Sequence, residues 1–350
     1  MPVKSSLRNL PSQIIWRMPM RFRIANLLGS RYALRCVLFH HIAAEDSPFT
    51  KGLGITLGVE DFDAKMRFLA EHYSPMSLED VLALPTGKRL PRRPVLLTFD
   101  DAYASVAEVA GPICRKYGIP ATFFVNASLV GNQDLGLDNL VCYSVNRFGL
   151  EPVRKAARQV SANPALQILS LTHFFGAFLP NLSLQSRREF RDALELASGF
   201  RSTDLAREAK LYVSADQLRS LVSQGFSIGN HTYTHVNCRV LSGDDFDQEI
   251  FANQRVLEAI VNRKVRAFSV PYGSSADVSR ELLTHLRQSG HEALFLVESL
   301  ANTAATDYFH LYRVSVTARS DANFFGELEI EPRLRSIRNR LFRQRAKTFQ

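Results

Sequence analysis

The chain has 350 residues, 46% of them hydrophobic and 10% aromatic, which is enough to bury a sizeable core in one large domain or two ordinary ones. Its four cysteines form no CxxC pair and no other metal-binding spacing, which argues against thiol chemistry and favours a reduced, intracellular protein. The net charge of +9 comes from the two ends of the sequence: residues 1–44 carry seven Lys and Arg with no Asp or Glu, and residues 331–350 carry seven Lys and Arg with one Glu. The remaining residues are net acidic, which disfavours nucleic-acid binding.

The first part of the chain alternates apolar runs with amphipathic segments. Its predicted elements are a strand at 34–39, a helical segment at 59–84, a strand at 95–99, a helix at 106–116 and a strand at 121–125. Ser77 is expected to be an N-cap within the helical segment, and Gly118 to close the next helix. Strand, helix and strand in this order predict a parallel α/β sheet or barrel.

This alternation is lost from about residue 131 to 211, where helical patterns predict an insertion that caps the barrel. It resumes with helices at 215–223, 246–261 and 278–289, strands at 226–228, 267–270 and 293–297, and a candidate last strand at 314–316. We therefore divide the chain into a basic N-terminal segment (1–33), a barrel with its insertion (34–318) and a basic tail (319–350).

Polar or unusual residues follow four of the predicted strands: His40-His41, Asp100-Asp101, His231 with His235, and Pro271-Tyr272-Gly273. In a parallel barrel the C-terminal ends of the strands share one face, where active sites lie. We expect these four groups to converge on one site.

The histidines and paired aspartates are the donors expected for a divalent cation. His231 and His235 are four residues apart, so a single helical turn would let both imidazoles reach one ion. Adjacent carboxylates repel each other, and a cation held by one of them offsets the repulsion while the other stays free as a base. These ligand types suit zinc and leave cobalt, nickel, iron and manganese open. A second pair, Asp244-Asp245, lies at a polar helix start and is expected to be solvated.

Three ordered segments carry a resemblance to a known family. Residues 98–101 (TFDD), 231–235 (HTYTH) and 268–273 (FSVPYG) resemble the three main motifs of the polysaccharide deacetylases, the NodB-homology enzymes of carbohydrate esterase family 4. The resemblance covers about residues 34–318 outside the insertion. It implies an irregular (β/α)7-type barrel and the metal-dependent removal of acetyl groups from N-acetylglucosamine units.

Carried over to the matching positions, the resemblance assigns a role to each motif residue. It makes Asp100 the general base and Asp101, His231 and His235 the ligands of a divalent metal, most simply zinc. The backbone N–H of Tyr272 is then expected to help hold the oxyanion. Two residues of the third motif, Pro271 and Gly273, and Tyr103, which follows the first motif, are assigned to substrate binding.

The general acid of the family is usually a histidine in a Leu-x-His motif, of which this chain has no convincing copy. His310, in residues 309–313 (FHLYR), resembles part of the family's closing strand instead. Residues 39–42 (FHHI) are similar to the Tyr-His-x-Ile/Val motif of exopolysaccharide-type members, whose histidine is the acid. The resemblance therefore assigns the acid to His40, with His41 as the alternative.

Two departures from the family pattern leave other interpretations open. Ala102 stands where a glycine usually follows the aspartates, and Ser269 where many members have an arginine that orients the catalytic aspartate. With the missing Leu-x-His motif, they motivate the alternative of a catalytically impaired saccharide-binding or scaffold protein. The structural alternatives are His40 as a core histidine, Tyr272 as a packing residue and the two aspartates as a turn-capping pair. Hydrolysis of another amide or ester also stays open, because a metal centre does not choose the acyl group.

The resemblance implies an N-acetylated saccharide as the substrate, either a poly- or oligosaccharide of exopolysaccharide biosynthesis or its lipid-linked precursor. The first forty residues hold no apolar run of signal-peptide length, and the run at 166–179 is too short to cross a bilayer, so a cytoplasmic location is expected. Leu334, Ile337, Leu341 and Phe342 repeat at helical spacing among arginines, which is typical of a helix peripheral to the inner membrane face. A solvated or locally docked tail is the alternative.

Overall fold

Parallel strands form the centre of the molecule. The computed structural model describes residues 14–18, 20–28, 30–84, 90–161, 168–303, 306–307, 309–316 and 320–338. Its strands are β1 (Arg35–Phe39), β2 (His41–Ile42), β3 (Thr56–Leu57), β4 (Ser74–Met76), β5 (Pro94–Phe99), β6 (Ala121–Val125), β7 (Ser227–Asn230), β8 (Ala267–Ser269), β9 (Ala293–Leu296) and β10 (His310–Ser315).

Seven of these strands close into a barrel. The order is β1-β10-β9-β8-β7-β6-β5, and β5 pairs with β1 from Arg35 opposite Val95 to Phe39 opposite Phe99. Every pairing is parallel, and β4 adds an eighth strand beside the first half of β5. The predicted (β/α)7-type barrel is confirmed.

The strands form because they are apolar on both sides. All residues of β1, β5 and β6 are buried, as expected for parallel strands covered by helices. Alternate residues point into the barrel, where a cluster includes Cys36, Leu96, Phe124, Phe295 and Leu311. Two residues beyond Leu311 on β10, a fully buried arginine continues this inward series.

The α-helices are α3 (Arg21–Leu28), α4 (Val59–His72), α5 (Leu78–Leu82), α6 (Gly111–Lys116), α7 (Leu137–Phe148), α8 (Glu151–Val160), α9 (Leu171–His173), α10 (Leu184–Ser198), α11 (Ser202–Ala209), α12 (Ala215–Ser223), α13 (Ala252–Val261), α14 (Arg280–Gln288) and α15 (Asp321–Phe325). Single π-helical turns precede or follow several of them: η1 (Val106–Ala110), η3 (Phe174–Phe178), η6 (Asp247–Phe251) and η8 (Gly326–Ile330). Short 3₁₀ turns are η2 (Ala127–Leu129), η4 (Leu179–Asn181), η5 (Cys238–Val240) and η7 (Ser275–Asp277).

The continuous helical segment predicted at 59–84 is wrong. The chain leaves α4 at Tyr73 and forms β4 before α5 begins, because Pro75 cannot continue a helix and disfavours helical geometry at Ser74. Ser77 then caps α5 as predicted, in a capping box with Asp80.

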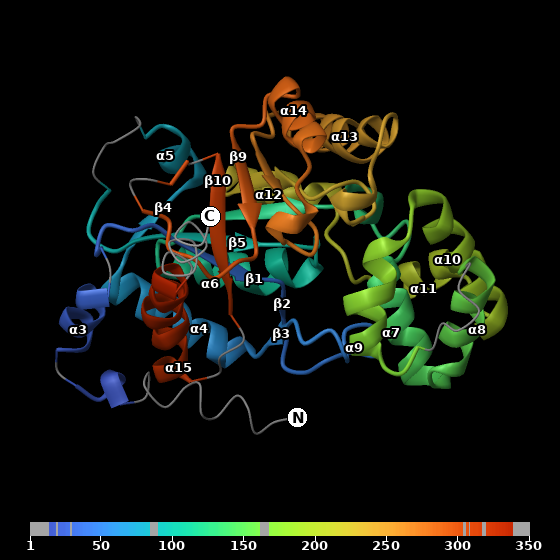
Figure 1. The fold of residues 1–350 in the computed structure, drawn as a ribbon, viewed down its shortest axis with the longest axis horizontal. Helices are drawn as coiled ribbons and strands as arrows, with labels where there is room; N and C mark the ends of the chain where they lie inside the picture. Colours follow the sequence, from blue (N-terminus) through green and yellow to red (C-terminus); the bar gives the residue numbers. More distant parts are fainter. Residues whose placement is uncertain are drawn as a thin grey trace, which may run out of the picture.

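The segment predicted as an insertion contains α7 to α11. Figure 1 shows these helices gathered on one side of the barrel, with α9 facing the β2–β3 connection. The β2–β3 connection packs against α7. The side chain of Asn146 on α7 donates to the carbonyls of Pro48 and Lys51, and the ring of Phe49 stacks on that of Tyr143 with centroids 4.7 Å apart.

The terminal segments pack together at the other end of the molecule (Figure 1). Residues 331–338 are helical and continue from α15 and η8. Buried Glu329 pairs with Arg35 at 2.8 Å and with Arg333 at 2.7 Å. The predicted tail helix is thus locally docked where it begins, while its residues Leu341 and Phe342 lie outside the described residues. None of the helices in the described ranges is long and apolar enough to cross a membrane.

Candidate active site

A cavity of about 250 Å³ lies where the C-terminal ends of the strands meet the insertion. Seven of the residues predicted from the sequence line it: His40, Asp100, Asp101, Tyr103, His231, His235 and Tyr272. The insertion contributes Asp138, Asn139 and Phe175 to the same wall. The barrel and the insertion therefore build the site together.

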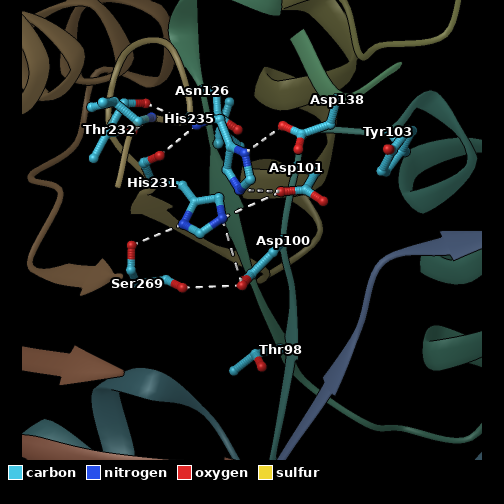
Figure 2. Close-up of polar contacts among 12 residues, drawn as sticks. Thr98, Asp100, Asp101, Tyr103, Asn126, Asp138, His231, Thr232, His235 and Ser269 are labelled. Carbon is cyan, nitrogen blue, oxygen red and sulfur yellow. Dashed lines mark hydrogen bonds and ion pairs between the residues drawn. The ribbon is translucent and has the colours of Figure 1, made fainter. Parts of the chain in front are cut away.

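Asp101, His231 and His235 converge on one point. Asp101 Oδ1 lies 3.3 Å from His231 Nε2 and 3.4 Å from His235 Nε2. Figure 2 shows both imidazoles turned towards this carboxylate. A tetrahedral ion with bonds of about 2.0–2.1 Å separates its ligand atoms by about 3.4 Å. Asp101 Oδ1 is buried and accepts no other hydrogen bond. These three residues fit a divalent cation, and in the described part of the chain they are the one group of its kind.

Both imidazoles are oriented by their other ring nitrogen. His231 Nδ1 lies 2.8 Å from the carbonyl oxygen of Ser269, so it must donate, and His235 Nδ1 lies 3.0 Å from Asp138 Oδ2. A donating Nδ1 leaves the lone pair of Nε2 free for a cation. Asp138, at the start of α7, carries no local sequence signal and was not among the predicted site residues.

The turn that carries the two histidines is not the predicted helical turn. Residues 231–235 contain no helix, and the backbone is left-handed at Thr232 (φ 60°) and His235 (φ 56°). The side chain of Asn126 holds this turn by donating to the carbonyls of His231 and Thr232. The i, i+4 spacing correctly indicated that the two imidazoles meet, but a non-helical turn and not a helix brings them together.

Asp100 is held by an arginine from the last strand. Arg313 is the fully buried arginine inside the barrel, and its guanidinium donates to Asp100 Oδ1 at 2.7 Å and Oδ2 at 2.8 Å. The hydroxyl of Ser269 donates to Oδ2 at 3.0 Å. Burial raises the pKa of Asp100, but the charge and the hydrogen bonds of Arg313 oppose this, and the pKa lies below the ordinary value. Asp100 is thus kept as a carboxylate.

Arg313 bears on one of the departures from the family pattern. Its Nη2 also donates to the hydroxyl of Ser269 at 2.7 Å, so serine and arginine hold Asp100 jointly. The guanidinium lies 5.4 Å from the ring of Phe124 and 5.9 Å from that of Phe295. This chain therefore has serine at position 269, where the family pattern often has arginine, but an arginine from β10 contacts Asp100 instead.

Strained backbone is concentrated at the site. Left-handed φ angles occur at Asp101 (72°), Ala102 (57°) and Tyr272 (63°), in addition to the two positions in the histidine turn. Such conformations cost a residue with a Cβ roughly 1–2 kcal/mol. This explains in physical terms why glycine suits position 102.

The two candidate acids differ in their surroundings. His40 lines the cavity; burial lowers its pKa, and the charges of Asp101 and Asp100 oppose this shift without cancelling it. His41 is turned to Ser105, whose hydroxyl lies 2.9 Å from its Nδ1, and does not line the cavity. Of the two histidines, only His40 therefore has access to the cavity.

The residues assigned to substrate binding separate into two groups. Tyr103 lines the cavity, and its hydroxyl accepts a hydrogen bond from Asn139 at 2.9 Å. Pro271 and Gly273 do not line it. Gly273 has a backbone role instead: its φ is 76°, and a Cβ there would lie 2.3 Å from a methyl group of Val297.

Comparisons with known proteins agree with this geometry. A family model described as polysaccharide deacetylase matches residues 87–294, more than half of the chain. YxkH of Bacillus subtilis (strain 168) is 28% identical over 102 residues, 29% of this chain and 34% of that protein. Poly-beta-1,6-N-acetyl-D-glucosamine N-deacetylase of Staphylococcus aureus (strain MSSA476) is 32% identical over 74 residues, 21% of this chain and 26% of that protein. The matches thus span only about a third and a quarter of these two relatives.

Two solved structures share the fold. The Streptococcus pyogenes deacetylase PplD in complex with acetate has a TM-score of 0.57 at 17% identity, covering 86% of this chain and all of that one. A de-N-acetylase from Aggregatibacter actinomycetemcomitans has a TM-score of 0.53 at 15% identity, covering 85% of this chain and all of that one. With the family match over most of the barrel, these findings show that the chain belongs to the polysaccharide deacetylase family.

Proposed function

We propose that this protein is a metal-dependent hydrolase that removes N-acetyl groups from an N-acetylglucosamine-type poly- or oligosaccharide or its lipid-linked precursor. The observation that carries the proposal is the convergence of Asp101, His231 and His235 beside the ionised Asp100 in one cavity. The S. aureus relative is named for a polymer of N-acetylglucosamine, which supports this substrate class.

The proposed chemistry begins with three ligands and a base. Asp101, His231 and His235 would hold the cation, with zinc the simplest choice for two imidazoles and a carboxylate. When bound, the cation would polarise the acetamide carbonyl and make a nearby water more acidic. Asp100 takes the proton from the attacking water, and its bonds to Arg313 keep its carboxylate ionised and oriented.

The remaining steps need an oxyanion partner and an acid. We assign the first to the backbone N–H of Tyr272, whose ring lines the cavity and lies 5.3 Å from that of His235. We assign the second to His40, which gives a proton to the leaving amine. The lowered pKa of His40 makes its proton easier to transfer, although it also reduces the protonated fraction at neutral pH.

The size of the cavity bears on the substrate. A volume of about 250 Å³ lies just below the usual range of ligand pockets, which begins at about 300 Å³. Apolar side chains from three separate segments, Leu53, Phe175 and Val297, line it. We infer that one acetylated sugar unit enters while the rest of the saccharide stays outside.

Acetate release from N-acetylated saccharides tests the proposal. We expect release by the full chain, its loss with a chelator and its recovery with added zinc. Asp101→Ala and His231→Ala should abolish release, whereas Asp244→Asn, at the exposed member of the second aspartate pair, should not. Release that survives Asp101→Ala would contradict the proposal. Saccharide binding without acetate release at any metal loading would instead favour the non-catalytic alternative.

A further inference from the structure

Exposed apolar side chains are concentrated at the terminal end of the molecule. The described residues expose ten large apolar side chains, and six of them lie on two short segments, 14–28 and 331–338: Ile14, Met18, Met20, Leu27, Leu334 and Ile337. The other four are distributed singly over the insertion and α13. Single exposed apolar residues need no explanation, but a concentration of this kind marks an interaction surface.

The two segments are neighbours in space, although the sequence separates them by some 300 residues. Arg333 donates from Nη1 to the carbonyl of Ala25 at 2.6 Å. Phe22 and Trp16 pack on Phe325 with ring centroids 5.3 and 5.8 Å apart. Figure 1 places α3 and α15 at the end of the molecule opposite α7 to α11. We call residues 14–18 and 20–27 together with 331–338 the terminal surface.

The exposed face of each segment mixes apolar and basic side chains. Met20, Arg23 and Leu27 are exposed at spacings of three and four residues on and beside α3, and so are Leu334, Ile337 and Arg338 on the C-terminal helix. Residues 14–32 contain no Asp or Glu. The two acidic residues nearest to Arg333 in the sequence are already engaged: Glu331 pairs with Arg335, and Glu329 is buried.

We propose that the terminal surface binds the anionic face of a lipid bilayer. Apolar side chains among arginines match a bilayer surface, where the apolar groups enter the headgroup boundary and the cations meet lipid phosphates. A second copy of the chain fits less well, because it would bring arginines against arginines. The proposal is independent of the chemistry at the active site, and an inner membrane face is one such anionic surface.

Co-sedimentation of the full chain with vesicles tests this. We expect binding to phosphatidylcholine vesicles that contain about one third phosphatidylglycerol, weaker binding at raised salt, and little binding to phosphatidylcholine alone. Leu27→Ser should weaken binding about tenfold through lost apolar burial. Arg23→Gln should weaken it about fivefold, as expected for one cation near an anionic surface.

The control is Leu196→Ser on α10, because Leu196 is 81% exposed and Leu27 is 85% exposed. It should leave vesicle binding unchanged, and all three variants should keep the thermal stability of the parent because each residue is exposed. Equal vesicle binding by Leu27→Ser and Leu196→Ser would overturn the proposal. So would a failure to bind anionic vesicles combined with a self-association that Leu27→Ser disrupts, which would assign the terminal surface to a second copy.

Discussion

Replacing Arg313 by methionine should destabilise the protein strongly. Arg313 is fully buried and Asp100 is 3% exposed, and two hydrogen bonds of 2.7 and 2.8 Å join them. Methionine fills much of the same volume between aromatic rings but leaves the Asp100 carboxylate without its guanidinium. Removing one partner of a buried ion pair costs about 3–5 kcal/mol, because the other charge remains desolvated.

The loss should depend on pH, with a sign that follows from Asp100. Without Arg313, burial raises the pKa of Asp100 above its unfolded value, so the folded protein holds a proton that the unfolded chain releases. Stability of the variant is then greatest below the unfolded pKa and falls as the pH rises through the folded pKa. The difference from the parent protein should therefore be small near pH 4 and largest at pH 8.

Urea unfolding in the presence of a chelator, at several pH values, measures this difference without contribution from a bound cation. Asp100→Asn combined with Arg313→Met removes both charges and should recover at least half of the lost free energy. An Arg313→Met variant within about 1 kcal/mol of the parent at pH 8 would refute the reasoning, as would a double variant no more stable than Arg313→Met alone.

Three further expectations follow from the site and the core. Ala102→Gly should raise the free energy of unfolding by up to about 1 kcal/mol, because it relieves an alanine in the left-handed region. Ala104→Gly, at a position where φ is not positive, should lower that free energy by a similar amount, and urea unfolding of the two variants measures both differences. Asp138→Asn should weaken zinc affinity about 10–100-fold in a chelator competition, while Asp134→Asn in the same insertion should not. Burial lowers the pKa of His291 to about 4, so the free energy of unfolding should fall by up to about 3 kcal/mol as the pH drops from 6.5 towards 4. This contribution to the pH dependence should be absent from the His291→Gln variant, which urea unfolding over the same pH range measures.

Much of the barrel was predictable because its strands are short apolar runs with turn residues between them. The runs at 95–99 and 121–125 coincide with β5 and β6 almost residue for residue. The prediction failed at β4, whose three residues are too few to show a period and follow an amphipathic helix directly. The apolar pattern alone placed the last strand too late, at 314–316, because the polar residues of β10, which begins at His310, hide its apolar pattern. The resemblance of residues 309–313 to the family's closing strand agrees with β10.

The site divides in the same way. Asp100, Asp101 and the two histidines were found because each pair is contiguous or nearly so and follows a strand. Arg313 was not predicted as a site residue, because such a prediction requires knowing where β10 starts and which residues of β10 face inward. From Leu311, which faces the barrel interior, the period of two leads directly to Arg313.

Contacts between the insertion and the histidine turn have a consequence for how the two parts behave. Asp138 on α7 touches the ring of His235, and Arg187 on α10 donates to the carbonyl of the same residue at 3.1 Å. A cation that binds His235 therefore also stabilises the contact between the insertion and the barrel. Cation binding and the packing of the insertion on the barrel are thus thermodynamically linked. Amide exchange in α7 and α10 should slow when zinc is added, and exchanging the insertion for the loop of a relative would change metal affinity even if every ligand were kept.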